Sequence, residues 1–226
     1  LYEAEENAKA ANRLVVSKQA GTSDITVKEL NLSTPQSEPL LQKISAHFKA
    51  GSSYLIKGPS GIGKSTFIRA IAGIWPFASG IIHLPQNKKI LFLPQKPYMP
   101  IGTLEEAILF PDKSNPALIE HVKQVLKDCH LEHLIPRLQE TAAWTEQLSP
   151  GELQRIGFAR VFLHRPDWVI LDESTSMLDV ANEEHLYQLL EAKLPHCSVI
   201  SIGHRPTLLA HHDEVIDMSN YAVKTI

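Results

Sequence analysis

Nine consecutive residues have the types and the spacing needed to bind phosphate. They are Gly58, Pro59, Ser60, Gly61, Ile62, Gly63, Lys64, Ser65 and Thr66, which fit the pattern G-x-x-x-x-G-K-[ST]. Glycines let the backbone curl so that successive N–H groups point at phosphate oxygens. Lys64 would bring a positive charge to the β and γ phosphates, and the Ser65 hydroxyl can ligate Mg²⁺. The stretch therefore predicts a nucleotide site, and a glycine-rich turn with an incidental lysine is the weaker alternative.

An acid pair is the second candidate for chemistry. Asp172 and Glu173 follow the apolar run 168–171, which reads as a buried strand. Acids at the carboxyl end of such a strand lie where ligands bind in open α/β sheets. Asp172 suits a hold on Mg²⁺, and Glu173 suits a general base that deprotonates attacking water. A pair that caps a following helix is the structural alternative, and the phosphate-binding pattern favours the functional interpretation.

The elements around these residues alternate between strand-like and helix-like patterns. We expect strands over 25–32, 41–48, 53–56, 80–84, 90–93, 168–171, 198–202 and 213–218, and helices over 1–16, 67–72 and 183–194, with further helix starts at Thr103, Asn115 and Gly151. Such alternation predicts an α/β fold with a mostly parallel sheet. The helical stretch between the phosphate-binding residues and residue 168 should form a subdomain of its own.

The composition narrows the class of protein. The chain has 226 residues, of which 43% are hydrophobic and 21% charged, as in an ordinary globular protein. A net charge of −3 gives no reason to expect nucleic acid as a partner. Cys129 and Cys197 lack metal-type spacing and read as idle thiols. No apolar run approaches the ~20 residues of a membrane-spanning helix.

Further motifs follow in an order that resembles a known family. After the phosphate-binding residues come Gln95, the run L-S-P-G-E-L-Q-R at 148–155, the strand with its acid pair, S-M-L-D at 176–179, and His204. Over roughly residues 22–226 this order resembles the nucleotide-binding domain of ABC transporters. The resemblance implies an α/β P-loop NTPase fold with a mostly parallel core sheet, an N-terminal antiparallel β subdomain and a helical subdomain at about 97–163.

The resemblance also implies a role for each matching residue. Gln95 would sense the γ phosphate, ligate Mg²⁺ with Ser65 and Asp172, and lead into a segment, 96–102, that touches a membrane domain. Ser149, Gly151 and Glu152 would bind the ATP held by a second copy of the domain. Asp179 would line the seam between the copies, and His204 would position the attacking water beside Glu173 and Lys64. The structural alternatives are a polar loop residue at Gln95, a helix N-cap at Ser149 and one more histidine among 11 at His204. His211 and His212 have no such placement and read as surface residues.

Closer features resemble subfamily D of these transporters. They are the segment 92–100, the tripeptide Gly102-Thr103-Leu104, and Trp144 shortly before Leu148. That subfamily includes peroxisomal fatty acyl transporters and bacterial relatives for cobalamin or antimicrobial peptides, in which a membrane domain precedes the ATPase domain. Residues 1–21 are therefore expected to be a connector from an N-terminal transmembrane domain of a longer protein.

Three positions depart from the pattern of the family. Pro150 replaces a glycine of the signature and removes one backbone donor. Glu152 replaces a glutamine and brings a negative charge near phosphates. Thr34 and Pro35 stand where many relatives carry an aromatic residue that stacks on adenine, so we expect base recognition to be weaker or to rest on Pro35 or Leu41. Hydrolysis remains the expectation, with its rate and nucleotide selectivity in question.

The resemblance implies an ATPase, with Mg²⁺ as cofactor, that drives transport when two copies close head to tail on ATP. The expected partners are a second copy and the chain's own transmembrane domain. The expected location is the cytoplasmic face of a membrane, taken to be a bacterial inner membrane. The 226-residue piece itself is expected to be soluble. One alternative is a soluble ABC ATPase of translation or DNA maintenance, which the short span from Ser65 to Leu148 disfavours. The other is a degenerate module that binds ATP with little turnover, which Pro150 leaves open.

Overall fold

A five-stranded parallel sheet forms the centre of the molecule. The computed structural model describes residues 13–113 and 115–223. The strand order in this sheet is β11-β4-β10-β9-β6. Its strands are β4 (Ser53–Lys57), β6 (Ile90–Leu93), β9 (Trp168–Asp172), β10 (Ser198–Ile202) and β11 (Glu214–Asp217). Short apolar runs such as those of β9 and β10 form strands here because the sheet is covered on both faces.

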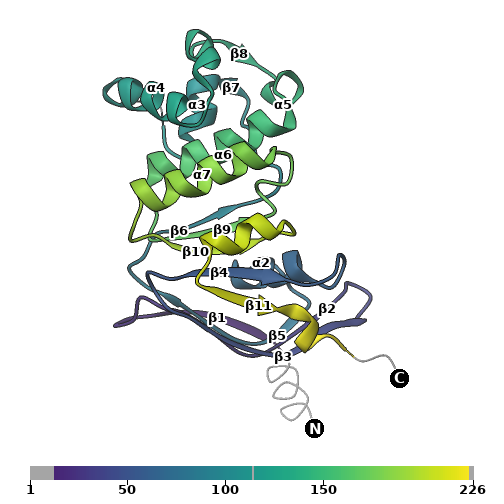
Figure 1. The fold of residues 1–226 in the computed structure, drawn as a ribbon. Coiled ribbons are helices and arrows are strands. Elements are labelled where there is room, and N and C mark those ends of the chain that lie inside the picture. Colours follow the sequence, from purple (N-terminus) through teal and green to yellow (C-terminus); the bar gives the residue numbers. More distant parts are fainter. Residues whose placement is uncertain (1–12, 114, 224–226) are drawn as a thin grey trace.

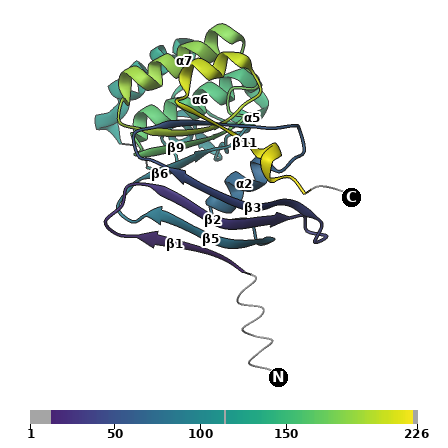
Figure 2. The same ribbon diagram turned by 60° about the horizontal axis from the view of Figure 1, so that its bottom comes forward.

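A second sheet of four strands lies beneath the first (Figures 1 and 2). Its order is β1-β5-β2-β3, with β1 (Leu14–Gln19), β2 (Ile25–Ser33), β3 (Pro39–Phe48) and β5 (Ala78–Pro85). The pairs β2–β3 and β2–β5 are antiparallel, whereas β1 and β5 are parallel. The sheet is therefore mixed, where the sequence had predicted an antiparallel one.

Helices cover the two faces of the central sheet differently. Helix α2 (Lys64–Ile71) is packed between the two sheets (Figure 2), and α6 (Pro150–His164) and α7 (Val180–Lys193) cover the opposite face (Figure 1). Farther out lie α3 (Leu104–Leu109), α4 (Ile119–Asp128), α5 (Trp144–Gln147), the pair β7 (Gly102–Thr103) and β8 (Thr141–Ala142), and the 3₁₀ turns η1 (Pro116–Leu118) and η2 (Glu132–Arg137). Two more 3₁₀ turns, η3 (Pro206–His211) and η4 (Met218–Tyr221), flank β11.

Two apolar cores share the central sheet as a wall. Alternate residues of β9 belong to different cores, with Trp168 and Ile170 facing α2, and Val169 and Leu171 facing α6 and α7. Each of these side chains is at most 1% exposed. The indole N–H of Trp168 also donates to the carbonyl of Ser23, 2.9 Å away, which joins the central sheet to the start of the lower one. Alternation along one strand thus holds three layers together.

The structure confirms the α/β fold with its mostly parallel core sheet and corrects the start of the described chain. Residues 14–16 were predicted to end a helix, but they belong to β1, where they pair in parallel with residues 80–82 of β5. Residue 13 of that predicted helix is a bend, and residues 1–12 lie outside the described residues. Gly80 makes the pairing of β5 possible, because a Cβ there would lie 2.7 Å from the Cα of Leu30. Within the described residues no helix is long and apolar enough to cross a membrane.

The predicted helix starts follow from their capping residues. Thr103 caps α3 in a capping box with Glu106, as the sequence indicated, and Asn115 caps η1 immediately before α4. Helix α7 begins at Val180 rather than 183, since Asp179 accepts a hydrogen bond from the backbone N–H of Asn182 at 2.7 Å. The boundaries proposed for a connector and a helical subdomain stay predictions.

Candidate functional site

The phosphate-binding residues form the loop between β4 and α2. Gly63, at the start of α2, has φ +112°, and a Cβ there would press on Leu41 at 3.3 Å. The ammonium of Lys64 donates to the carbonyls of Gly58 and Pro59, both at 2.9 Å, and the residue is only 5% exposed. Burial lowers the pKa of Lys64, although the nearby carboxylates oppose that effect. The loop is therefore already curled around a cation, with its backbone preorganised for an anion.

Ser65 and Asp172 meet at the end of the central sheet. The Ser65 hydroxyl donates to Asp172 Oδ1 at 2.8 Å. Burial raises the pKa of Asp172, and the neighbouring charge of Glu173 raises it further. A desolvated carboxylate beside a hydroxyl is a set of hard oxygen ligands, which is the chemistry that Mg²⁺ prefers. In the described part of the chain, no group of three or more His, Cys, Asp or Glu side chains could hold a metal ion.

Glu173 lies between two other predicted residues. His204 Nε2 is 3.2 Å from one of its carboxylate oxygens, and the amide of Gln95 is 3.4 Å from the other. His204 follows β10, Glu173 follows β9 and Gln95 follows β6. These strands are neighbours in the sheet, so their carboxyl ends bring the three side chains together. Glu173 itself has φ +50°, an uncommon conformation for a residue with a side chain. A carboxylate that contacts an imidazole and an amide can hold and activate a water molecule.

The predicted signature residues form a second cluster at the start of α6. Ser149 caps the helix, and its hydroxyl and backbone N–H contact Glu152 in a capping box. Pro150 occupies the first helical position, where a missing N–H costs least. Gly151 lies so close to the carbonyl of Met177 that a Cβ at this position would be only 3.3 Å from that oxygen. The cluster borders a cavity of about 310 Å³ that Asp179 also lines.

Glu152 has a partner that the sequence did not reveal. His133 Nε2, from η2, lies 2.6 Å from a carboxylate oxygen of Glu152. Burial raises the pKa of Glu152, but hydrogen bonds from Ser149 and His133 outweigh burial and leave that pKa below its usual value. The carboxylate is thus ionised and sits beside a group that can carry the opposite charge.

Gln154, for which the sequence predicted no role of its own, connects these parts together with Ser176, which belongs to the run 176–179 expected at the seam between the copies. The buried amide of Gln154, on α6, contacts the backbone of Gln95 and of Glu173, and Ser176 Oγ accepts from the amides of both Gln154 and Gln95. Gln154 lies inside the signature run, among residues that α6 buries. A polar side chain on an otherwise buried helix face is the signal that could have singled it out.

The residues considered for base recognition lie differently from what the sequence suggested. Leu41 is fully buried in the core and is not accessible to a ligand. Instead, Pro39 and Leu40 line a cavity of about 380 Å³ together with Gly61 and Ile62 of the phosphate-binding loop. This cavity offers apolar surface beside the loop.

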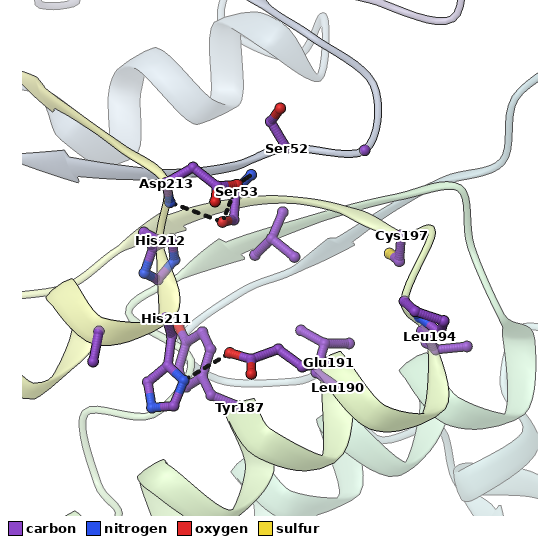
Figure 3. A pocket seen from close by; sticks show the side chains of 14 residues that line it. Ser52, Ser53, Tyr187, Leu190, Glu191, Leu194, Cys197, His211, His212 and Asp213 are labelled. Atoms are coloured by element: carbon purple, nitrogen blue, oxygen red, sulfur yellow. Dashed lines mark hydrogen bonds and ion pairs between the residues drawn. The ribbon is translucent and has the colours of Figure 1, made fainter.

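A separate pocket of about 380 Å³ opens at the opposite edge of the central sheet, where β4, β10 and β11 begin (Figure 3). His211 and His212 line it, so the prediction that both are ordinary surface residues is wrong. His211 stacks on the ring of Tyr187 and contacts Glu191 at 2.8 Å (Figure 3). His212 joins the Leu208 carbonyl at 2.6 Å and the Ser201 hydroxyl at 2.8 Å.

The chain is similar in sequence to proteins of one family. Residues 41–176 match the family model described as ABC transporter. An uncharacterized ABC transporter ATP-binding protein of Haemophilus influenzae is 38% identical over 206 residues, which cover 91% of this chain and 35% of that protein. ABC transporter D family member 3 of Dictyostelium discoideum is 38% identical over 204 residues, covering 85% of this chain and 27% of that protein. The chain spans about a third of the length of these curated relatives.

A solved structure agrees with the fold. It is described as a bacterial Atm1-family ABC exporter with ATP bound, and it matches 90% of this chain and 38% of its own with a TM-score of 0.76. The two sequences are 24% identical, so this likeness establishes the arrangement of strands and helices.

Proposed function

Because the chain belongs to the ABC transporter family, we propose that it is the ATP-hydrolysing domain of a membrane transporter. One observation carries the assignment of the reaction centre. The ends of three neighbouring strands bring Glu173 within 3.4 Å of both His204 and Gln95, next to the Ser65–Asp172 pair and the phosphate-binding loop. These are the groups that a phosphoryl transfer to water needs, which are an anion cradle, a cation site and a base.

The phosphates of ATP would bind on residues 58–66. Backbone N–H groups of the loop and the N-terminus of α2 would face the phosphate oxygens. Lys64 would exchange its bonds to the Gly58 and Pro59 carbonyls for the β and γ phosphates. The base of the nucleotide would pack against Pro39 and Leu40, which line the cavity beside the loop.

Ser65, Asp172 and Gln95 would hold Mg²⁺. The hydroxyl, carboxylate and amide oxygens of these residues suit a hard cation, and the raised pKa of Asp172 reflects a carboxylate whose charge a cation would compensate. When bound there, the ion would supply positive charge that offsets the charge developing on the phosphates during transfer.

Glu173 would remove a proton from the water that attacks the γ phosphorus. His204 would hydrogen-bond the γ phosphate and hold the water in line, while Gln95 would orient the carboxylate from the other side. A positioned general base of this kind contributes about 10²–10⁴-fold to a rate. Loss of the leaving ADP and phosphate would then reopen the site.

A second copy of the chain would complete the site. Ser149, Gly151 and Glu152 stand at the N-terminus of α6, where the capping box uses the N–H groups of Ser149 and Glu152 and Pro150 has none, so the N–H of Gly151 would donate to the γ phosphate held by the partner copy. Asp179 lines the same cavity and would lie at the seam. Head-to-tail closure on ATP would pull attached membrane helices from one access state to another.

The likeness to subfamily D members supports a transporter whose own transmembrane domain precedes this one, with residues 1–21 as the connector and 97–163 as the helical subdomain. In this arrangement the domain lies at the cytoplasmic face of a membrane, in bacteria the inner membrane. Segment 96–102 would contact the membrane domain, since Tyr98 and Ile101 are 63% and 95% exposed.

Replacement of Glu173 by glutamine tests the proposal. ATP turnover of the full chain should fall by at least about 10²-fold, and gel filtration with Mg-ATP should show a dimer that the wild type does not accumulate. Glu184→Gln is the matched control, because Glu184 is an exposed carboxylate on α7 that contacts Gln188. Equal turnover in wild type and Glu173→Gln would reject Glu173 as the base.

A further inference from the structure

One buried amide on α6 forms hydrogen bonds through both of its polar atoms. Gln154 is 1% exposed, whereas most of its buried neighbours on the helix are apolar. Its Nε2 lies 3.1 Å from the carbonyl of Gln95, 3.3 Å from that of Glu173 and 3.2 Å from the hydroxyl of Ser176. Its Oε1 accepts from the backbone N–H of Met177 at 2.9 Å. A buried polar side chain with this many hydrogen-bond partners fixes the groups that it contacts.

The partners of Gln154 are the segments that carry the reaction centre. Gln95 follows β6, while Glu173, Ser176 and Met177 follow β9. The amide of Gln95 reaches back to the carboxylate of Glu173 and to Ser176 Oγ, which closes a small network around the Gln154 side chain. One residue of α6 therefore joins both loops from which the predicted base and its neighbour project.

Glu173 needs such support, because its backbone is in the left-handed region with φ +50°. Its N–H donates to the Ile202 carbonyl at 3.2 Å, and its own carbonyl accepts from the Ser176 N–H at 3.1 Å and from Gln154 at 3.3 Å. These bonds hold the residue on both sides. Without the Gln154 bond, only the local turn to Ser176 would hold the carbonyl, and the peptide after Glu173 could relax and turn the carboxylate away from His204.

The packing of α6 keeps this contact short. Gly157 lies one turn beyond Gln154, and a Cβ there would lie 2.7 Å from Leu93 Cδ1 and 3.1 Å from Pro97 Cγ. These two residues flank Gln95 on either side. The missing side chain thus lets α6 approach the segment close enough for the Gln154 amide to reach the Gln95 carbonyl.

We propose that Gln154 is a positioning residue that orients Glu173 and Gln95 of its own domain and couples them to the N-terminus of α6. This inference rests on the proposed function. The signature residues that would bind the partner's ATP lie five residues or fewer before Gln154 at the start of the same helix. Because a helix rises only about 1.5 Å per residue, so short a stretch moves as one rigid body. Docking of Ser149 on the partner's ATP therefore sets the position of Gln154, and Gln154 sets the base in its own site.

Gln154→Leu removes the hydrogen bonds at similar volume and is the principal test. We expect kcat for ATP hydrolysis by the full chain to fall about 10²-fold, the scale of a 1 Å misplacement of a reacting group. The KM for ATP should change by less than threefold, and the melting temperature should change by only a few degrees. Gln124→Leu is the matched control, because Gln124 is an exposed glutamine on α4 that contacts only Asp128 among the described residues. Gln154→Glu keeps the acceptor for Met177 N and loses the donors, so it should show the same loss and carries the test if the leucine variant does not fold.

A double-mutant cycle with Glu173→Gln separates positioning from general damage. If Gln154 acts through Glu173, adding Gln154→Leu to Glu173→Gln lowers the residual turnover by less than threefold. A further 10²-fold loss, or a Gln154→Leu single variant within threefold of wild type, overturns the inference while the proposed function stands. Equal turnover in wild type and Glu173→Gln overturns both.

Discussion

Replacement of Glu173 by glycine should make the protein more stable while it abolishes hydrolysis. The residue has φ +50°, and a left-handed conformation costs a residue with a Cβ roughly 1–2 kcal/mol. Glycine avoids that cost but loses more chain entropy on folding, roughly 0.5–1 kcal/mol. The lost contacts are long, at 3.2 Å to His204 and 3.4 Å to Gln95, and subtract little. With the middle of each range, about 1.5 against about 0.75 kcal/mol, the free energy of unfolding should rise by roughly 0.5–1 kcal/mol.

Thermal melting without nucleotide measures this difference. For a domain of this size, about 0.5–1 kcal/mol corresponds to a melting temperature about 1–4 °C higher. Glu173→Gln is the reference, because it removes the charge next to Asp172 and keeps the Cβ, so both variants share any gain from reduced repulsion. If the glycine variant melts at or below the glutamine variant, the backbone of Glu173 is not strained and the reasoning fails.

Two further outcomes are expected from groups outside the reaction centre. In the Glu173→Gln background, His133→Gln should raise the ATP concentration needed for dimer formation by about two- to fivefold, because Glu152 would lose the partner that balances its charge near the phosphates. Gel filtration at graded ATP concentrations measures the midpoint of dimer formation, and an unchanged midpoint contradicts the prediction. Burial lowers the pKa of His212, so the folded protein favours the neutral ring and stability falls as the pH drops below about 6.5, where the unfolded chain takes up the proton. His212→Gln should flatten this part of the stability curve in urea titrations at pH 5 and 7.5, and an equally steep curve in both proteins would show that other groups cause it.

The residues of the proposed reaction centre could be located largely from the sequence because they belong to local motifs. Asp172 ends the apolar strand β9, His204 comes two residues after β10, and Lys64 follows β4 by the loop of residues 58–63. Neighbouring parallel strands bring their carboxyl ends together. The capping residues Thr103 and Ser149 likewise announce their helices through a pattern of four residues.

The remaining features depend on contacts between distant segments. Strand β1 exists because residues 14–19 pair with β5, far along the chain, and helical spacing of its apolar residues gave no hint of that. The contacts of Gln154 require α6 to come close to β6. The small size of Gly157 allows this approach, but no local sequence pattern predicts it. The enclosure of His212 follows from the Tyr187 and Ser201 side chains, which belong to α7 and β10.

The topology of the central sheet has a consequence for biosynthesis. Strand β4, which leads into the phosphate-binding loop, pairs on its two sides with β10 and β11, and both are translated after residue 197. On the ribosome the loop is made before residues 198–217, so β4 waits for those residues before it has a neighbour in the sheet. A stalled or truncated chain that ends before Ser198 would expose the apolar β4 and be a target for chaperones and proteases. Nucleotide binding is thereby restricted to chains whose translation has run almost to the end of this domain.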